Sequence, residues 1–224
     1  MGCRFFGQPI WSIMNGSIFK KSLKALLGLT ICGCGEFLMI NSGIGMAPWE
    51  TLTLAVSGKT GLSYGVIYIF IGVSVVIADL LLKEKIGIGT LLDCFWCGIV
   101  IDLIGMTGVF KTPQALWLQI LCLLAGIVIQ GFGLVYYIGA GLCCGPRDAL
   151  LVGIGKRLRH WKIGMVNMLI QITVFVIGVL LGGPFGIGTI IATFGVGPIQ
   201  QGVFDLMHFE PRDVVHEGLG FRGA

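Results

Sequence analysis

The sequence predicts an all-α membrane protein with six transmembrane helices, arranged as two inverted three-helix repeats that each contain a Gly-rich break and a short half-helix. Three observations predict this fold. Only 12% of the 224 residues are charged, about half the share of a soluble domain, and the mean hydropathy is +0.94. Charged residues are absent from three long stretches of the chain, and its two halves share motifs in a constant register.

Apolar segments long enough to cross a bilayer are expected at 22–42, 62–82, 89–110, 114–138, 162–182 and 187–207. A spanning helix needs about 20 apolar residues, so the 42 uncharged residues between Lys162 and Asp205 hold two spans. Gly182-Gly183-Pro184 separates them. The first segment follows 21 residues and shows no small-residue cleavage site, so we expect an uncleaved span instead of a secretory signal.

Lysine and arginine fall mostly on one side of these spans. With the N-terminus inside, 13 of the 15 basic residues are cytoplasmic, and only Lys59 and Lys111 face out. The positive-inside rule therefore predicts a cytoplasmic N-terminal segment at 1–21 and a cytoplasmic tail at 208–224. The basic residues flank spans and form no aromatic-rich basic surface, so no nucleic-acid partner is expected.

The halves 22–110 and 111–207 repeat each other. A shift of 98 residues aligns glycines, Pro48 with Pro146 and Glu50 with Asp148, and a shift of 99 aligns Gly-Ile-Gly-Thr at 87–90 with the same four residues at 186–189. A glycine-rich chain also produces chance Gly matches, but a four-residue match in register is harder to obtain by chance. Because each repeat holds three spans, the second enters the membrane inverted, as in many transporters.

The segments 41–50 and 139–148 break the helical pattern with clustered glycines. Each then places proline where a helix would start, which suits the first helical position, and an acid two residues later, which complements the positive helix end. Broken helices at matching places in two repeats indicate a binding site. The alternative is a pair of ordinary interfacial loops. The candidate substrate-binding residues are Pro48, Trp49, Glu50, Pro146, Arg147 and Asp148.

A family resemblance rests on these motifs. Pro48-Trp49-Glu50, Gly145-Pro146-Arg147-Asp148, the two Gly-Ile-Gly-Thr segments and the six-span layout resemble the YczE/YyaS/YitT family of bacterial membrane proteins, the YczE branch in particular. The resemblance covers about residues 22–207. It implies a bacterial cell (inner) membrane location and leaves the activity open. Glu50 stands where the family pattern often has aspartate, which keeps the charge.

Glu36 and Asp102 lie inside predicted spans, where an ionised acid on a lone helix costs roughly 2.5–3.5 kcal/mol on insertion scales. Neither has a basic residue within its span. They are candidates for binding a coupling ion or proton, and the alternative is a buried structural hydrogen bond. Asp79 and Asp93 are expected near the inner boundary, in contact with water.

Other polar residues leave several interpretations open. Arg147 replaces the equivalent Trp49, and it could bind an anion, pair with Glu50 or Asp148, or follow the positive-inside rule. Gln130, Asn167 and Gln171 are expected to join helices. The eight cysteines lie in spans or on the reducing side, so neither a metal site nor a redox function is expected.

The sequence favours a small-solute transporter or permease with a site between the two breaks. The alternatives are a non-transporting accessory protein of a biosynthetic or export complex, and a substrate-capture subunit of a larger transporter. Motifs for hydrolases, metalloproteases and phosphate binding are missing, so neither an enzyme nor a cofactor is expected. The expected partners are the lipid bilayer, an unknown small-molecule substrate and a possible second copy of the chain.

Overall fold

The computed structural model describes residues 18–84, 86–142, 145–158, 160–161, 163–210 and 214, and every regular element among them is a helix. In chain order they are α1 (Ile18–Ile40), α2 (Pro48–Thr60), α3 (Tyr64–Leu81), α4 (Ile88–Thr107), α5 (Leu116–Ile138), α6 (Pro146–Arg157), α7 (Ile163–Leu180) and α8 (Ile187–Leu206). Most of the predicted terminal segments, Cys143-Cys144 and six of the basic residues used for the orientation lie outside the described residues.

The predicted spans correspond to α1, α3, α4, α5, α7 and α8, and the predicted half-helices to α2 and α6. Five of these spans are long and apolar enough to cross a membrane, whereas the apolar part of α7 covers only Met165–Leu180. Large apolar side chains such as Phe70, Trp117 and Phe194 lie exposed on the long helices. An apolar surface of this extent suits contact with lipid.

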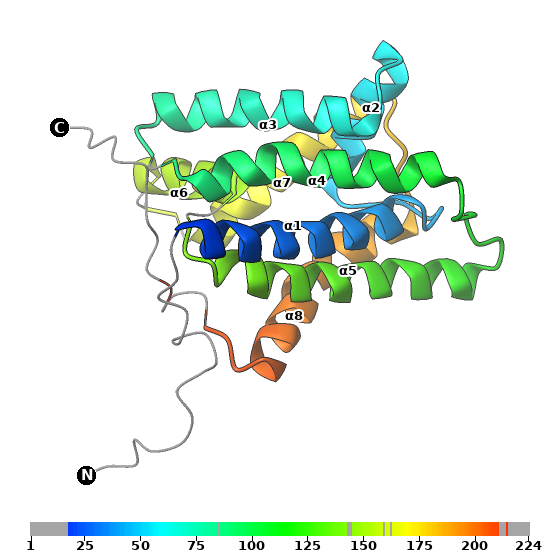
Figure 1. The fold of residues 1–224 in the computed structure, drawn as a ribbon. Coiled ribbons are helices and arrows are strands. Elements are labelled where there is room, and N and C mark those ends of the chain that lie inside the picture. Colours follow the sequence, from blue (N-terminus) through cyan, green and yellow to red (C-terminus); the bar gives the residue numbers. More distant parts are fainter. Residues whose placement is uncertain are drawn as a thin grey trace, which may run out of the picture.

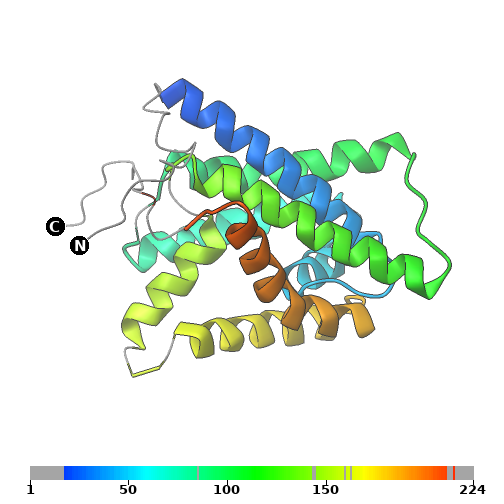
Figure 2. The same ribbon diagram turned by 90° about the horizontal axis from the view of Figure 1, so that it is seen from below.

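The helices pack as a bundle with one short helix at each end. α1 packs along α5 and α4, α3 packs on α4, and α5 packs on α8. The short helix α2 contacts α7 and α3, and α6 contacts α3 and α7. Figure 1 shows α2 at one end of the bundle and α6 at the other, and the perpendicular view in Figure 2 shows α8 crossing the bundle beside α5.

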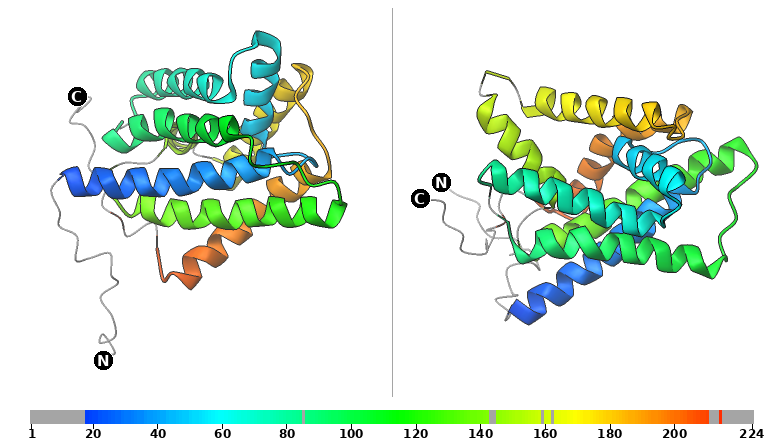
Figure 3. Two further views of the ribbon diagram at one scale, coloured as in Figure 1. Left: turned by 45° about the vertical axis from the view of Figure 1, so that its right-hand side comes forward. Right: turned by 90° about the horizontal axis from the view of Figure 1, so that it is seen from above.

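Helices α1 and α5 run antiparallel and approach closely at glycines (Figure 3). A Cβ added to Gly28 would lie 2.8 Å from the carbonyl oxygen of Gly133, and one added to Gly133 would lie 2.7 Å from that of Gly28. Gly35 and Gly126 meet in the same way, at 2.6 and 2.7 Å. Small residues let membrane helices pack backbone to backbone, so these four glycines set the α1–α5 distance.

The two short helices begin with nearly the same backbone geometry. Ala47, before Pro48, has φ −68° and ψ 161°, and Gly145, before Pro146, has φ −63° and ψ 161°. Proline lacks the N–H that would have no partner at this position, and its fixed φ suits a helix start. The sequence therefore predicted both starts correctly.

The Gly-Ile-Gly-Thr segments begin α4 and α8. In each, the threonine hydroxyl accepts a hydrogen bond from the first glycine's N–H, Gly87 to Thr90 at 3.2 Å and Gly186 to Thr189 at 3.3 Å. The second glycine donates its N–H to the opposite half of the chain, Gly89 to Leu142 at 2.8 Å and Gly188 to Ile44 at 2.7 Å. The motif thus ties the start of each long helix to the break in the other half.

Candidate functional site

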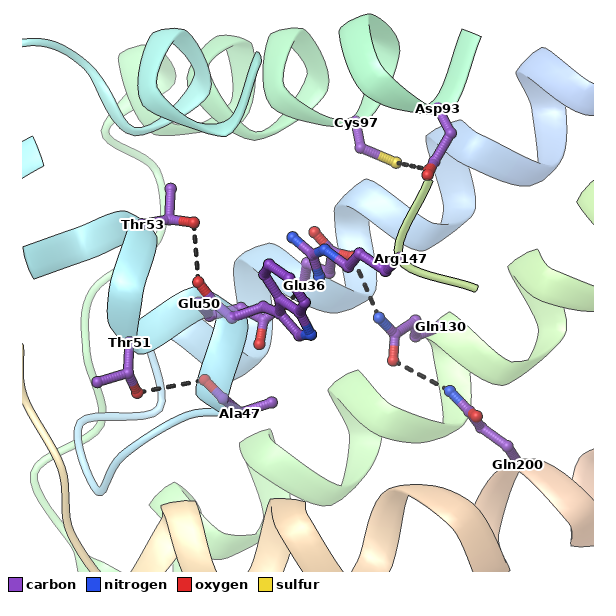
Figure 4. Close-up of polar contacts among 11 residues, drawn as sticks. Glu36, Ala47, Glu50, Thr51, Thr53, Asp93, Cys97, Gln130, Arg147 and Gln200 are labelled. Atoms are coloured by element: carbon purple, nitrogen blue, oxygen red, sulfur yellow. Dashed lines mark hydrogen bonds and ion pairs between the residues drawn. The ribbon is translucent and has the colours of Figure 1, made fainter. Parts of the chain in front are cut away.

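A buried ion pair joins the two helix breaks. Arg147, at the second residue of α6, donates from Nη1 to Oε1 of Glu50, at the third residue of α2, over 3.0 Å. Glu50 is 2% exposed, and the Arg147 side chain is 26% exposed. The breaks bring the beginnings of α2 and α6 close enough for these side chains to meet, as Figure 4 shows. Of the roles that the sequence left open for Arg147, the structure shows the ion pair with Glu50.

Aromatic rings surround the Arg147 guanidinium. Its carbon lies 5.2 Å from the centroid of the Trp49 ring and 5.0 Å from that of Tyr68, within the range of cation–π attraction. The Tyr64 ring follows at 6.3 Å from Tyr68. Sequence reasoning missed both tyrosines. Their spacing of four residues at the start of a span was the available signal, because it places both rings on one helix face.

A chain of polar side chains leads away from the ion pair. Gln130 on α5 donates from Nε2 to Oε1 of Glu36 on α1 over 3.1 Å, and Gln200 on α8 donates to Oε1 of Gln130 over 3.3 Å. Glu36 is 4% exposed. Gln130 thus joins α5 to α1 and α8, as expected of a polar residue between membrane helices, whereas Asn167 on α7 is exposed.

Two buried oxygen atoms near this centre have no hydrogen-bond partner in the described part of the chain: Oε2 of Glu36 and Oε2 of Glu50. Buried polar atoms are nearly always paired, and those that are not call for an explanation. We call Glu36, Trp49, Glu50, Tyr64, Tyr68 and Arg147 the central cluster.

Two pockets open at the end of the bundle where α1 ends and α3 begins. One, of about 390 Å³, is lined by the break at 43–46 and by 184–187 before α8. The other, of about 370 Å³, is lined by α1, the start of α3 and the end of α4. Ile40 and Leu54 line both. Tyr64 lines the second pocket and is also a member of the central cluster. Its side chain therefore connects the two.

Asp102, a candidate for a coupling ion or proton, lines the second pocket together with Tyr64. Its Oδ1 accepts from the Gly65 N–H over 2.8 Å, and its Oδ2 accepts from the Ser63 hydroxyl. Ser63 in turn accepts from the Val66 N–H and caps α3. Both carboxylate oxygens of Asp102 thus hold the beginning of α3, which corresponds to the structural alternative.

The exposure of the remaining acids to water differs from the expectation. Asp148, a candidate binding residue, is exposed on the first turn of α6, while Pro48, Trp49, Glu50 and Pro146 are buried. The expectation that Asp79 contacts water is wrong. Its exposed fraction is 0%, because α3 packs on α6 near this end of the helix. Asp93 is half-buried and accepts a weak bond from the Cys97 thiol at 3.7 Å.

Among the described residues, no group of three or more His, Cys, Asp or Glu side chains could hold a metal ion. The five cysteines with described surroundings, Cys32, Cys34, Cys94, Cys97 and Cys122, are free thiols. The central cluster itself offers carboxylates, aromatic rings and one guanidinium.

Comparisons with known proteins agree with the resemblance noted from the motifs. Residues 19–204 match the model of a family of unknown function, DUF6198. The chain is 34% identical to an uncharacterized protein of Haemophilus influenzae over 82% of this chain and 83% of that protein. It is also 29% identical to the uncharacterized membrane protein YczE of Bacillus subtilis, over 78% and 80%, and 30% identical to YyaS of the same organism, over 74% and 83%. No solved structure matches.

Proposed function

The chain belongs to the DUF6198 family and is related to YczE and YyaS, and we propose that it is a transporter or permease for a small solute. The solute binds where the two helix breaks meet. The observation that carries this proposal is the buried Arg147–Glu50 pair, which joins the beginnings of α6 and α2. Charged residues buried among apolar helices are costly and mark solute or ion pathways in many membrane proteins.

An inverted repeat of two three-helix units is part of the proposal. The shift of 98 residues relates Gly28 to Gly126 and Gly35 to Gly133, so it exchanges the two glycine contacts of the α1–α5 seam. The shifts of 98 and 99 likewise relate Ile44 to Leu142 and Gly89 to Gly188. They exchange the two backbone hydrogen bonds between the halves. Such reciprocity supports a pseudo-twofold axis.

The central cluster lies on this proposed axis. Trp49 and Arg147 are equivalent in the repeat, and they contact each other. Cys32 and Gln130 are also equivalent, and the Cys32 thiol donates to the Gln130 carbonyl over 3.6 Å. In transporters with inverted repeats, the solute site lies at the repeat interface and is formed by discontinuous helices. A site on the axis can be opened alternately to either side when one repeat moves against the other.

The proposed setting is a bacterial cell membrane, crossed several times, with both termini in the cytoplasm. Lys59 and Lys111 then face out, and the two pockets near Tyr64 open on the outer side. Glu36 carries the coupling proton or ion, because one of its oxygens is buried without a partner in the described part of the chain. The chain acts without catalysis, and its partners are lipid and solute.

Uptake into proteoliposomes tests this proposal. A first screen measures the melting temperature of the purified protein with amino acids, vitamins, nucleobases, sugars, organic acids and lipophilic drugs. A ligand at 100 times its dissociation constant adds about 2.7 kcal/mol of stability. Each compound that stabilises the protein is then followed as a radiolabelled solute.

We expect uptake of at least one compound, reduced tenfold or more by Glu50→Gln. The matched control is Glu84→Gln, which removes the carboxylate of an ion pair with the exposed Lys156 at the far end of α6 and leaves uptake unchanged. No uptake of any stabilising compound, or uptake equal in both variants, contradicts the proposal and favours a non-transporting accessory role.

A further inference from the structure

The central cluster holds more acceptors than its single guanidinium uses. Glu50 gives only Oε1 to Arg147, and Glu36 gives only Oε1 to Gln130. The second oxygen of each carboxylate is buried without a partner in the described structure. When the two acids are ionised, both oxygens can only accept a hydrogen bond. The group that completes the cluster is therefore a donor.

The charges of the central cluster also favour a cationic ligand. Two carboxylates, Glu36 and Glu50, are buried around one guanidinium, so ionisation of both leaves one negative charge without compensation. A buried charge without a partner is strongly unfavourable. A solute cation that replaces the Arg147 guanidinium keeps this balance and brings donors to the free oxygens, whereas an anionic ligand adds a further charge without compensation.

The aromatic rings around Arg147 indicate the shape of the donor that the central cluster can bind. Trp49 and Tyr68 face the Arg147 guanidinium at 5.2 and 5.0 Å, and Tyr64 extends the aromatic wall toward the pocket of about 370 Å³. Aromatic faces attract cations, and guanidinium also stacks on them. Arg147 thus shows what the space accepts: a planar organic cation between rings and carboxylates.

We propose that the central cluster binds the guanidinium-like cationic group of a small organic solute, and that this group takes the place of the Arg147 guanidinium. This inference rests on the proposed function, since it names the solute class for the same site. Arg147 acts as an internal competitor. With 26% of its side chain exposed, it has room to turn away from Glu50 when the solute cation enters from the Tyr64 side.

Binding of methylguanidinium to the purified full chain tests the inference. The melting temperature, followed by tryptophan fluorescence, is measured against millimolar methylguanidinium chloride, with methylurea as the neutral analogue of similar shape. Sodium chloride at equal concentration controls for ionic strength, and sodium acetate tests an anion. We expect stabilisation by methylguanidinium alone.

Variants test the competition. Arg147→Ala removes the competitor, so methylguanidinium binds at least tenfold more tightly than to the wild type. Arg147→Gln gives the same direction if the alanine variant does not fold. Arg147→Lys keeps a competing charge and stays near the wild-type affinity. Adding Glu50→Gln to Arg147→Ala abolishes the gain, because the cation then loses its carboxylate.

Equal effects of methylurea or sodium chloride, stabilisation by acetate, or unchanged affinity in Arg147→Ala each overturn the inference. The result is separate from that of the uptake assay. Cation binding with the expected variant pattern but no uptake leaves the inference standing and removes the transport proposal. Glu50-dependent uptake of an anionic or neutral solute, without cation binding, does the reverse.

Discussion

At the residue scale, the Arg147–Glu50 pair illustrates how a buried charge depends on its partner. Arg147→Gln leaves the Glu50 carboxylate 2% exposed and unpaired. Removing one member of a buried pair costs about 3–5 kcal/mol, whereas replacing both by neutral groups is often nearly neutral. We expect Arg147→Gln to lower the free energy of unfolding by about 3 kcal/mol, and the double variant with Glu50→Gln to recover most of this loss.

A double-mutant cycle on the detergent-purified protein measures this coupling, with unfolding followed by tryptophan fluorescence. The pair Glu84–Lys156, which is largely exposed on the lysine side, serves as the reference, since such pairs contribute about 0–1 kcal/mol. If the two cycles give equal coupling, the central pair is screened by water and is not the buried ion pair described above.

Asp102 has a structural role instead, because both its carboxylate oxygens accept hydrogen bonds from the beginning of α3. Asp102→Ala removes the acceptor for the Gly65 N–H and for the Ser63 hydroxyl. Loss of such capping interactions typically costs about 1 kcal/mol, and we expect a loss of about that size here. Asp102→Asn keeps one acceptor and is expected to recover part of it. Thermal unfolding of the three proteins checks the order, and equal stability of Asp102→Ala and the native chain would refute the capping role.

At the element scale, the α1–α5 seam depends on four glycines. Gly133→Ala would bring a Cβ to 2.6 Å from the Cys32 backbone nitrogen and 2.7 Å from the Gly28 carbonyl. Backbone cannot move aside as a flexible side chain does, and overpacking costs typically 1–3 kcal/mol. We expect Gly133→Ala to destabilise the protein by about 2 kcal/mol.

The matched control for the seam is Gly202→Ala on α8. An added Cβ there meets nothing within 4 Å, and alanine is favoured over glycine within a helix by up to about 1 kcal/mol. The control variant should therefore be as stable as the native protein or more stable. Melting curves of both variants in the same detergent test the contrast, and equal losses would mean that the seam is looser than its distances indicate.

The elements themselves were largely predictable, because length, hydropathy and helix-start chemistry are local properties. The half-helices start at Pro48 and Pro146 as expected, and the span ends differ from the expected bounds by a few residues. Partners across helices were harder to predict. Nothing local distinguishes Asp102, which caps a neighbouring helix, from Glu36, which lies in the central cluster, since both are single acids in apolar segments.

The same limit explains the error at Asp79 and why the partners of Gln130 could not be predicted. A position near the end of a span favours contact with water, but α6 packs on α3 and buries Asp79. Gln130 pairs with Glu36 because α5 crosses α1 at the glycine seam, which aligns the two residues. Tyr64 and Tyr68 went unrecognised because tyrosine is common near membrane boundaries. Their role appears only when the Arg147 guanidinium is seen beside them.

At the scale of the whole molecule, the proposed orientation fixes which end of the bundle faces the cytoplasm. Lys59, at the end of α2, and Lys111, before α5, are exposed and are expected outside. Lys83, after α3, and Arg157, at the end of α6, are exposed and are expected inside. The same orientation turns the Tyr64 pocket outward, so the direction from which a solute cation reaches Glu50 depends on it.

Single cysteines in a cysteine-free background test this orientation in intact cells. We expect a membrane-impermeant maleimide to label Lys59→Cys and Lys111→Cys, because basic residues are concentrated on the cytoplasmic side and these two are the exceptions. Lys83→Cys and Arg157→Cys should react only after the membrane is permeabilised, which also shows that they are reactive. Labelling of Arg157→Cys in intact cells would place α6 outside and make the Tyr64 pocket a cytoplasmic entrance. Labelling of all four in intact cells would mean that the chain inserts in both orientations, so that the pocket beside Tyr64 would open to the outside in some molecules and to the cytoplasm in others.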